Sequence, residues 1–115
     1  MADTRPNNAS TLAANRLGPG DYTDPAILAA ERAHIFRRHW HFVGLDRDLA
    51  EPESWFLTKV AGTEIIIQRV AGDGLRAFVN VCPHRYNALV NAPNGRGRLR
   101  CGYHLWSFDD NGLAA

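Results

Sequence analysis

Cysteines, excess charge and long apolar runs are all scarce in this sequence. The 115-residue chain has two cysteines, and its 13 basic residues nearly balance its 12 acidic residues, for a formal net charge of +1. Without an excess of charge, nothing favours binding to nucleic acid or to an anionic membrane surface. No stretch approaches the length of a transmembrane helix, and residues 1–20 contain no apolar run of signal-peptide length. We therefore predict a cytoplasmic protein that binds neither nucleic acid nor membrane.

The length and composition indicate a single domain with a modest core. Residues 1–21 are rich in Ala, Asn, Ser, Pro and Gly, so we expect a mobile N-terminal tail there and a folded domain over residues 22–115. Two cysteines allow at most one disulfide. In a reducing compartment they stay free as thiols and can serve as metal ligands.

The folded part begins with a helix and continues as strands. Asp24-Pro25 is typical of a helix start, and the apolar stripe that follows predicts one helix over about 24–40. Strand-like segments follow at 54–60, 63–70, 75–81 and 98–101. Ala61-Gly62 and Asn94-Gly95 are typical of tight turns between strands.

Arginines alternate just before and along the last of these strands. Arg96, Arg98 and Arg100 would share one face, because side chains alternate across a strand. Such a face fits a docking patch for an acidic electron donor. It also fits an ordinary solvated strand face, which is the more common case.

Each cysteine is followed closely by a histidine, in the pattern Cys82-x-His84, sixteen residues, Cys101-x-x-His104. Two thiolates and two imidazoles form a ligand set for a soft or borderline metal. Structural zinc sites usually pair Cys with Cys and His with His. Here each motif instead combines one Cys with one His. This combination suits a two-iron cluster in which two cysteines hold one iron and two histidines hold the other. Zinc remains a less favoured alternative, as does a chance alignment of four structural residues.

This ligand pattern resembles that of the Rieske family, C-x-H followed by C-x-x-H at a similar distance. The flanking residues resemble, more narrowly, the Rieske portion of a ring-hydroxylating (Rieske non-haem iron) oxygenase α subunit; they are Arg85, Tyr103, Trp106, Phe108 and Asp109-Asp110-Asn111-Gly112. Two positions depart from that family. Tyr86 and Leu105 stand where glycine usually eases the turn, which bears on the loop geometry and not on the ligands.

The resemblance implies a mainly β fold, a Rieske-type antiparallel sheet with two cluster-binding loops. The N-terminal helix would precede the sheet, and the fold would be incomplete at its C-terminus. Residues 22–115 would form the Rieske [2Fe–2S] domain with its leading helix. Cys82 and Cys101 would bind the inner iron of the cluster, and His84 and His104 the outer iron.

The resemblance also implies an oxidoreductase that receives single electrons from a reductase or ferredoxin, and indirectly from NADH. These electrons would pass to a mononuclear Fe(II) centre in a second domain. Nothing in this chain matches the motif of that catalytic iron. We therefore expect only the N-terminal portion of an oxygenase α subunit, without catalytic residues of its own, and a homotrimer only in a full-length form. A free-standing Rieske ferredoxin, an electron carrier, is the alternative.

One further comparison separates two branches of the Rieske family. In the respiratory branch, a serine and a tyrosine after the second histidine donate hydroxyl hydrogen bonds to the cluster sulfurs, and a disulfide ties the loops. Here these positions are Trp106 and Phe108, and there is no third cysteine. The sequence thus predicts a cluster of low reduction potential, because each such donor favours the more negative, reduced state.

Overall fold

The computed structural model describes residues 17–72 and 74–115. Most of the tail predicted over 1–21 therefore lies outside the described residues, and its mobility stays a prediction. The chain divides into two compact units between Arg38 and His39. The first contains the α-helices α2 (Pro19–Thr23) and α3 (Pro25–Glu31), and the second contains the sheet and both Cys/His motifs.

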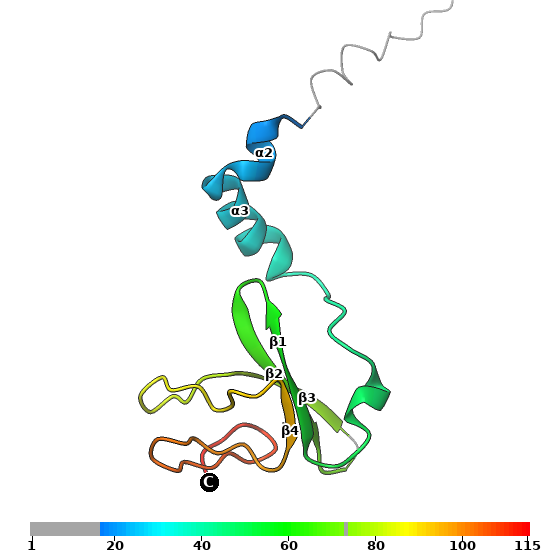
Figure 1. Cartoon of the computed structure of the whole chain (residues 1–115), viewed down its shortest axis with the longest axis vertical. Helices are drawn as coiled ribbons and strands as arrows, with labels where there is room; N and C mark the ends of the chain where they lie inside the picture. Colours follow the sequence, from blue (N-terminus) through cyan, green and yellow to red (C-terminus); the bar gives the residue numbers. More distant parts are fainter. Residues whose placement is uncertain (1–16, 73) are drawn as a thin grey trace, which may run out of the picture. The chain divides into compact units, whose positions relative to one another are not determined.

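In the helical unit, α3 starts at the predicted Asp24-Pro25, but a short helix, α2, precedes it and begins inside the segment predicted as a tail, and the helix ends earlier than predicted. α2 spans Pro19–Thr23, α3 spans Pro25–Glu31, and the helix continues as a π-helical turn, η1, over Arg32–Phe36 (Figure 1). The Asp24 side chain caps α3 by accepting a hydrogen bond from the N–H of Ala26, at 2.8 Å.

The helix ends at Phe36, four residues before the predicted end, because its hydrogen-bond spacing changes. The N–H of Arg37 donates to the carbonyl of Arg32, five residues back, and that of Arg38 to Ile35, three residues back. Neither spacing continues an α-helix. The sequence has no glycine or proline near this point to mark the end.

The sheet has four antiparallel strands in the order β3-β2-β1-β4 (Figure 1). β1 (Ser54–Val60) and β2 (Thr63–Val70) have the predicted bounds. Ala61 and Gly62 join them with positive φ angles of 50° and 85°, as in the hairpin turns that match strand twist. β3 spans Gly74–Val79 and ends two residues before the predicted strand end.

The prediction of a turn at Asn94-Gly95 is wrong, because these residues begin β4 (Asn94–Arg96) and pair with β1. A Cβ on Gly95 would lie 2.4 Å from Cζ2 of Trp55. Glycine is therefore needed here for close approach to a neighbouring ring and not for a turn.

The strand predicted over 98–101 is also wrong in extent, because only an isolated bridge between Arg100 and Ser107 forms there. Gly97 precedes it with a φ of 123°, which takes the chain out of strand geometry before a ladder can form.

The connection between the helices and the sheet contains a short 3₁₀ helix, η2 (Asp46–Leu49). The buried Arg69 side chain fixes it to β2 by donating to the carbonyl of Leu49 and to Asp46 Oδ1, the latter at 2.5 Å. This hydrogen-bonded ion pair holds the start of the sheet unit in place.

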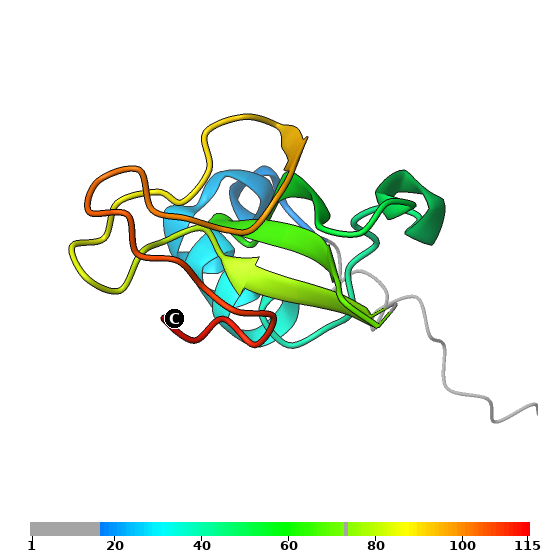
Figure 2. The ribbon, with the colours of Figure 1, turned by 90° about the horizontal axis from the view of Figure 1, so that it is seen from below.

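The core of the sheet unit lies between the sheet and two loops. Its buried residues are Ile66, Cys82, Leu99, Cys101 and Phe108. Figures 1 and 2 show the chain segments after β3 and after β4 projecting side by side from one end of the sheet. Each segment carries one Cys/His motif, so the fold brings together two motifs that are far apart in the sequence. Within the described residues, no helix has the length and apolarity needed to cross a membrane.

Candidate metal centre

The two Cys/His motifs form loops of the same design, a first loop over residues 82–87 and a second loop over residues 101–106. In each loop, the N–H of the cysteine donates to the carbonyl five residues later. The N–H four residues after the cysteine donates back to the cysteine carbonyl. These bonds are Cys82 to Asn87 (2.7 Å), Tyr86 to Cys82 (2.9 Å), Cys101 to Trp106 (2.8 Å) and Leu105 to Cys101 (3.0 Å). The C-x-H and C-x-x-H spacings, which differ in sequence, thus produce equivalent backbones.

The equivalence extends to backbone strain. Tyr86 and Leu105, each the fifth residue of its loop, have φ angles of 58° and 65°. This left-handed region favours glycine, because a side chain there crowds the backbone. The turn that glycine eases in the resembled oxygenases is therefore retained here, with larger residues in the same position.

The two cysteine side chains lie at the base of the loops, where they belong to the core. Cys82 and Cys101 are 1% and 2% exposed, and both are free thiols. Their neighbours are apolar, including Leu99 and Phe108. A metal held by these sulfurs would be shielded from water on the core side.

Hydrogen bonds to Cys101 favour its thiolate, which is the form that binds metal. The backbone N–H of Tyr103 lowers the pKa of the Cys101 thiol the most, and burial opposes it by raising the pKa. The backbone N–H of His104 and the side chains of Cys82 and Asn87 also lower the pKa. The net direction is downward, so the chain prepares this thiol to be a ligand.

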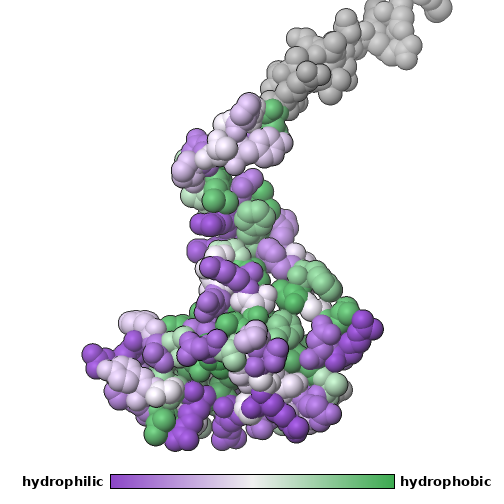
Figure 3. Space-filling model, in the orientation of Figure 1, coloured by the Kyte–Doolittle hydropathy of each residue, from purple (hydrophilic) through white to green (hydrophobic). Residues whose placement is uncertain are grey.

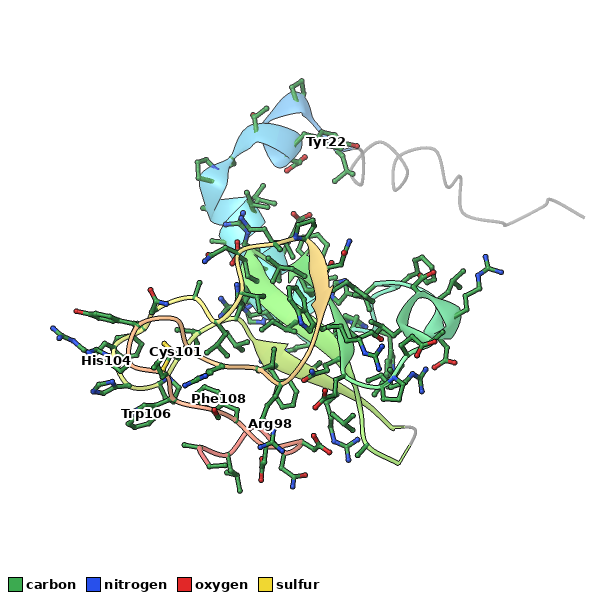
Figure 4. All side chains as sticks on the ribbon, turned by 60° about the horizontal axis from the view of Figure 1, so that its bottom comes forward. Tyr22, Arg98, Cys101, His104, Trp106 and Phe108 are labelled. Atoms are coloured by element: carbon green, nitrogen blue, oxygen red, sulfur yellow. The ribbon has the colours of Figure 1, made fainter. Side chains whose placement is uncertain are left out.

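The two histidines lie at the exposed tips of the loops. Their ring centroids are 4.7 Å apart with an interplanar angle of 65°. Figure 4 shows His104 at the tip, with Cys101 behind it and Phe108 nearer the sheet. The site therefore has an inner pair of buried thiols and an outer pair of exposed imidazoles.

This arrangement is one of two pairs and not of one compact cluster. Within the described part of the chain, no three Cys, His, Asp or Glu side chains are grouped so that one ion could bind them all. A two-iron cluster needs two protein ligands on each iron, which fits the paired donors found here.

Aromatic side chains surround the histidines. The Trp106 ring stacks on His84 at 4.8 Å with an interplanar angle of 2°. The Tyr103 ring lies 3.9 Å from His104, and the guanidinium carbon of Arg85 lies 5.7 Å from the Tyr103 ring centroid. The sequence identified these residues by family resemblance, and Trp106 also by its lack of a hydroxyl, but it did not predict these ring contacts.

Two asparagines at the site were missed by the sequence reasoning. Asn87 Nδ2 in the first loop lies 3.9 Å from Cys101 Sγ in the second and donates a weak hydrogen bond to it. Asn87 follows Tyr86 in an otherwise ordinary polar stretch, and no local pattern indicates a contact across loops. Its position in the chain, five residues after Cys82, is the one signal that could have identified it.

The second missed residue is Asn80, which is buried between β3 and the first loop. Its Oδ1 accepts from the N–H groups of Leu89 and Val90, at 3.0 Å each. Its Nδ2 donates to Glu64 Oε2 at 3.0 Å and to the Val90 carbonyl at 2.9 Å. One side chain thus ties the segment after the first loop to the sheet.

The three alternating arginines are all exposed, while Leu99 between them is buried. Arg96 donates to the Pro52 carbonyl at 3.0 Å, and Arg100 to the Leu105 carbonyl at 3.3 Å. Figure 4 shows Arg98 well away from His104. The loop end of the face seen in Figure 3 mixes hydrophilic and hydrophobic side chains.

Comparisons with known proteins identify relatives of the sheet unit. The family profile described as the Rieske [2Fe-2S] domain matches residues 39–115. The oxygenase subunit of carnitine monooxygenase from Acinetobacter baumannii is 36% identical over 96 residues, which is 82% of this chain and 26% of that protein. The large oxygenase component of naphthalene 1,2-dioxygenase from Pseudomonas fluorescens is 36% identical over 90 residues, 77% of this chain and 20% of that protein.

Solved structures agree with the sequence relatives. A quaternary ammonium Rieske monooxygenase in complex with L-carnitine superposes with a TM-score of 0.78 at 36% identity, covering 84% of this chain and 28% of that one. Naphthalene 1,2-dioxygenase with indole in its active site superposes with a TM-score of 0.72 at 34% identity, covering 76% and 20%. The chain thus spans about a quarter of the length of these proteins, and the mainly β antiparallel fold is confirmed.

Proposed function

We propose that this chain, which belongs to the Rieske [2Fe–2S] domain family, binds its cluster through Cys82 and Cys101 on one iron and His84 and His104 on the other. The observation that carries the assignment is the pairing of two buried thiols with two exposed imidazoles at the ends of equivalent loops. The lowered pKa of Cys101 supports it, since the ligand form is the thiolate.

A bound cluster of this type supplies one-electron transfer, at a potential raised by two neutral imidazoles in place of two thiolates. The chain's own residues bury the sulfur side of the site in the apolar core and leave the imidazole side exposed. An electron-transfer partner can therefore approach at His84 and His104, which are the exposed members of the proposed ligand set.

For a complete protein we propose an oxidoreductase of the Rieske non-haem iron oxygenase type. Electrons would come from NADH through a reductase or ferredoxin and would pass to a mononuclear iron centre in a further domain. The relatives support this proposal, since they are oxygenase subunits whose length this chain spans by 20–26%. A cytoplasmic location and a homotrimeric full-length form belong to the same proposal.

A free-standing Rieske ferredoxin is the weaker candidate. The relatives that match 77–82% of this chain are oxygenase subunits, and their matched region includes residues outside the cluster loops. The same ligand set would serve either protein, so the choice between them rests on the relatives and not on the site.

Iron and acid-labile sulfide analysis of the purified chain tests the ligand assignment. We expect two iron and two sulfide per chain in the wild type, and loss of both in Cys82→Ser and Cys101→Ser. His84→Ala and His104→Ala should lose the spectrum of a histidine-ligated cluster. The matched control is His39→Ala, an exposed histidine outside the loops. One zinc per chain without sulfide, or full cluster content in a cysteine variant, would overturn the assignment.

A further inference from the structure

The tips of the two loops are joined by side chains and by no covalent link. Both cysteines are at the base of the loops and both are free, so no disulfide connects the tips. The backbone hydrogen bonds described above close each loop on itself. Any fixed relationship between His84 and His104 must therefore come from side chains that cross from one loop to the other.

The first crossing is made by Trp106. Its carbonyl accepts the N–H of Cys101, which fixes its backbone at the end of the second loop. Its ring reaches the first loop and lies parallel to His84, at 4.8 Å and 2°. On another side, His84 meets the edge of His104. The imidazole of His84 is thus bounded by two rings of the opposite loop, which restricts its rotation.

The second crossing is made by Arg85 in the opposite direction. Arg85 belongs to the first loop, and its guanidinium lies over the ring of Tyr103 in the second, at 5.7 Å. Tyr103 in turn packs on His104 at 3.9 Å. The imidazole of His104 is therefore linked through Tyr103 to the first loop by a cation–π contact.

We propose that Trp106 and Arg85 are positioning residues that form an inter-loop clasp, consisting of the Trp106–His84 stack and the Arg85–Tyr103 contact. The clasp holds the two imidazoles at a fixed mutual orientation and so fixes the geometry of the histidine-bound iron. This inference rests on the proposed ligand roles of His84 and His104. It adds that two residues which donate nothing to the metal decide how rigidly the outer iron is held.

The two halves of the clasp have opposite electrostatic effects. The indole of Trp106 excludes water from one face of His84. Its removal admits water, which stabilises the more negative, reduced cluster and raises the reduction potential. The guanidinium of Arg85 favours the reduced state by its positive charge, so its removal lowers the potential. A purely space-filling role for either residue predicts no such pair of opposite shifts.

The experiment compares the cluster-loaded wild type with Trp106→Leu, Trp106→Phe, Arg85→Met and Arg85→Lys. Trp106→Leu keeps an apolar side chain but removes the ring and much of its volume, and Arg85→Met keeps most of the length without the charge. Trp40→Leu is the matched control, because Trp40 is fully exposed and makes no ring contact with the described residues. Iron and sulfide content is measured first in every variant, since its absence from the wild type would refute the ligand roles themselves.

With the cluster present, three readouts test the clasp. Trp106→Leu should broaden the electron paramagnetic resonance lines of the reduced cluster, raise the potential, and speed loss of iron to a chelator by about two- to tenfold, the factor equivalent to one aromatic pair. Trp106→Phe should restore the line width. Arg85→Met should lower the potential and Arg85→Lys should retain it. Unchanged line width and potential in both Trp106→Leu and Arg85→Met would overturn the clasp and leave the ligand assignment standing.

Discussion

Tyr86 and Leu105 are structural counterparts in the two loops. Each donates its N–H to the carbonyl of the cysteine four residues earlier, at 2.9 and 3.0 Å, and each has a φ near +60°. Both side chains are exposed, at 82% and 56%, so packing does little to compensate for the strained backbone. The backbone hydrogen bonds to the cysteine carbonyls therefore set the loop geometry. Tyr86 and Leu105 adopt the left-handed conformation that these bonds require, although residues with side chains rarely do so.

We expect Tyr86→Gly and Leu105→Gly each to stabilise the chain by about 0.5–1 kcal/mol. Relief of the left-handed strain, roughly 1–2 kcal/mol, exceeds the entropy that glycine adds to the unfolded chain, about 0.4–1 kcal/mol. Urea unfolding followed by tryptophan fluorescence measures the change. Ala77→Gly is the control: Ala77 is an exposed residue of β3 with ordinary strand geometry, and the substitution should destabilise by roughly 0.5–1 kcal/mol. Equal destabilisation by all three would contradict this account.

Asn87→Ala should lower the reduction potential of the cluster by about 20–60 mV. Its Nδ2 donates to Cys101 Sγ, and a donor favours the reduced state, which carries more negative charge. A net hydrogen bond of about 0.5–1.5 kcal/mol, at roughly 59 mV per 1.4 kcal/mol for one electron, gives this range. Because 3.9 Å is long even for sulfur, the lower half is expected. Spectroelectrochemistry at neutral pH measures the shift, and an unchanged or raised potential would contradict a donor role for Asn87 toward the cluster.

For the wild type we expect a midpoint potential between about −150 and 0 mV, the lower third of the range for Rieske centres. Trp106 and Phe108 stand where the respiratory branch has two hydroxyl donors, and each missing donor lowers the potential by up to roughly 60–130 mV. Such a value suits electrons from NADH through a reductase. A midpoint above about +100 mV, measured by the same titration, would place the protein in the other branch.

Asn80→Ala should destabilise the chain by about 2–4 kcal/mol and speed loss of the cluster. The substitution leaves the N–H groups of Leu89 and Val90 without their acceptor and releases the segment that follows the first loop. Asn91→Ala is the matched control, because Asn91 is exposed in the same segment and should change stability by less than about 0.5 kcal/mol. Equal effects in urea unfolding would mean that the Asn80 bonds do not hold this segment.

The features predicted from sequence are those that local chemistry specifies. Asp24-Pro25 began a helix because capping involves neighbouring residues. The hairpin of β1 and β2 had its predicted bounds because Ala61-Gly62 specifies the turn. Asn94-Gly95 carried an equally strong turn pattern and was misassigned. Glycine is needed at position 95 because the backbone there lies against the ring of Trp55, a residue about forty positions away in the sequence.

The four proposed ligands illustrate the same division. Their types and spacings alone predicted a cluster with cysteine and histidine ligands, since few combinations of residues provide two thiolates and two imidazoles in matching halves. Only the tertiary structure decided that the two motifs form equivalent loops, that the thiols are buried while the imidazoles are exposed, and that Trp106, Arg85 and Asn87 cross between the loops. The physical reason is that ligand chemistry belongs to single side chains, whereas burial and contact across loops depend on how the sheet brings together segments separated in the sequence.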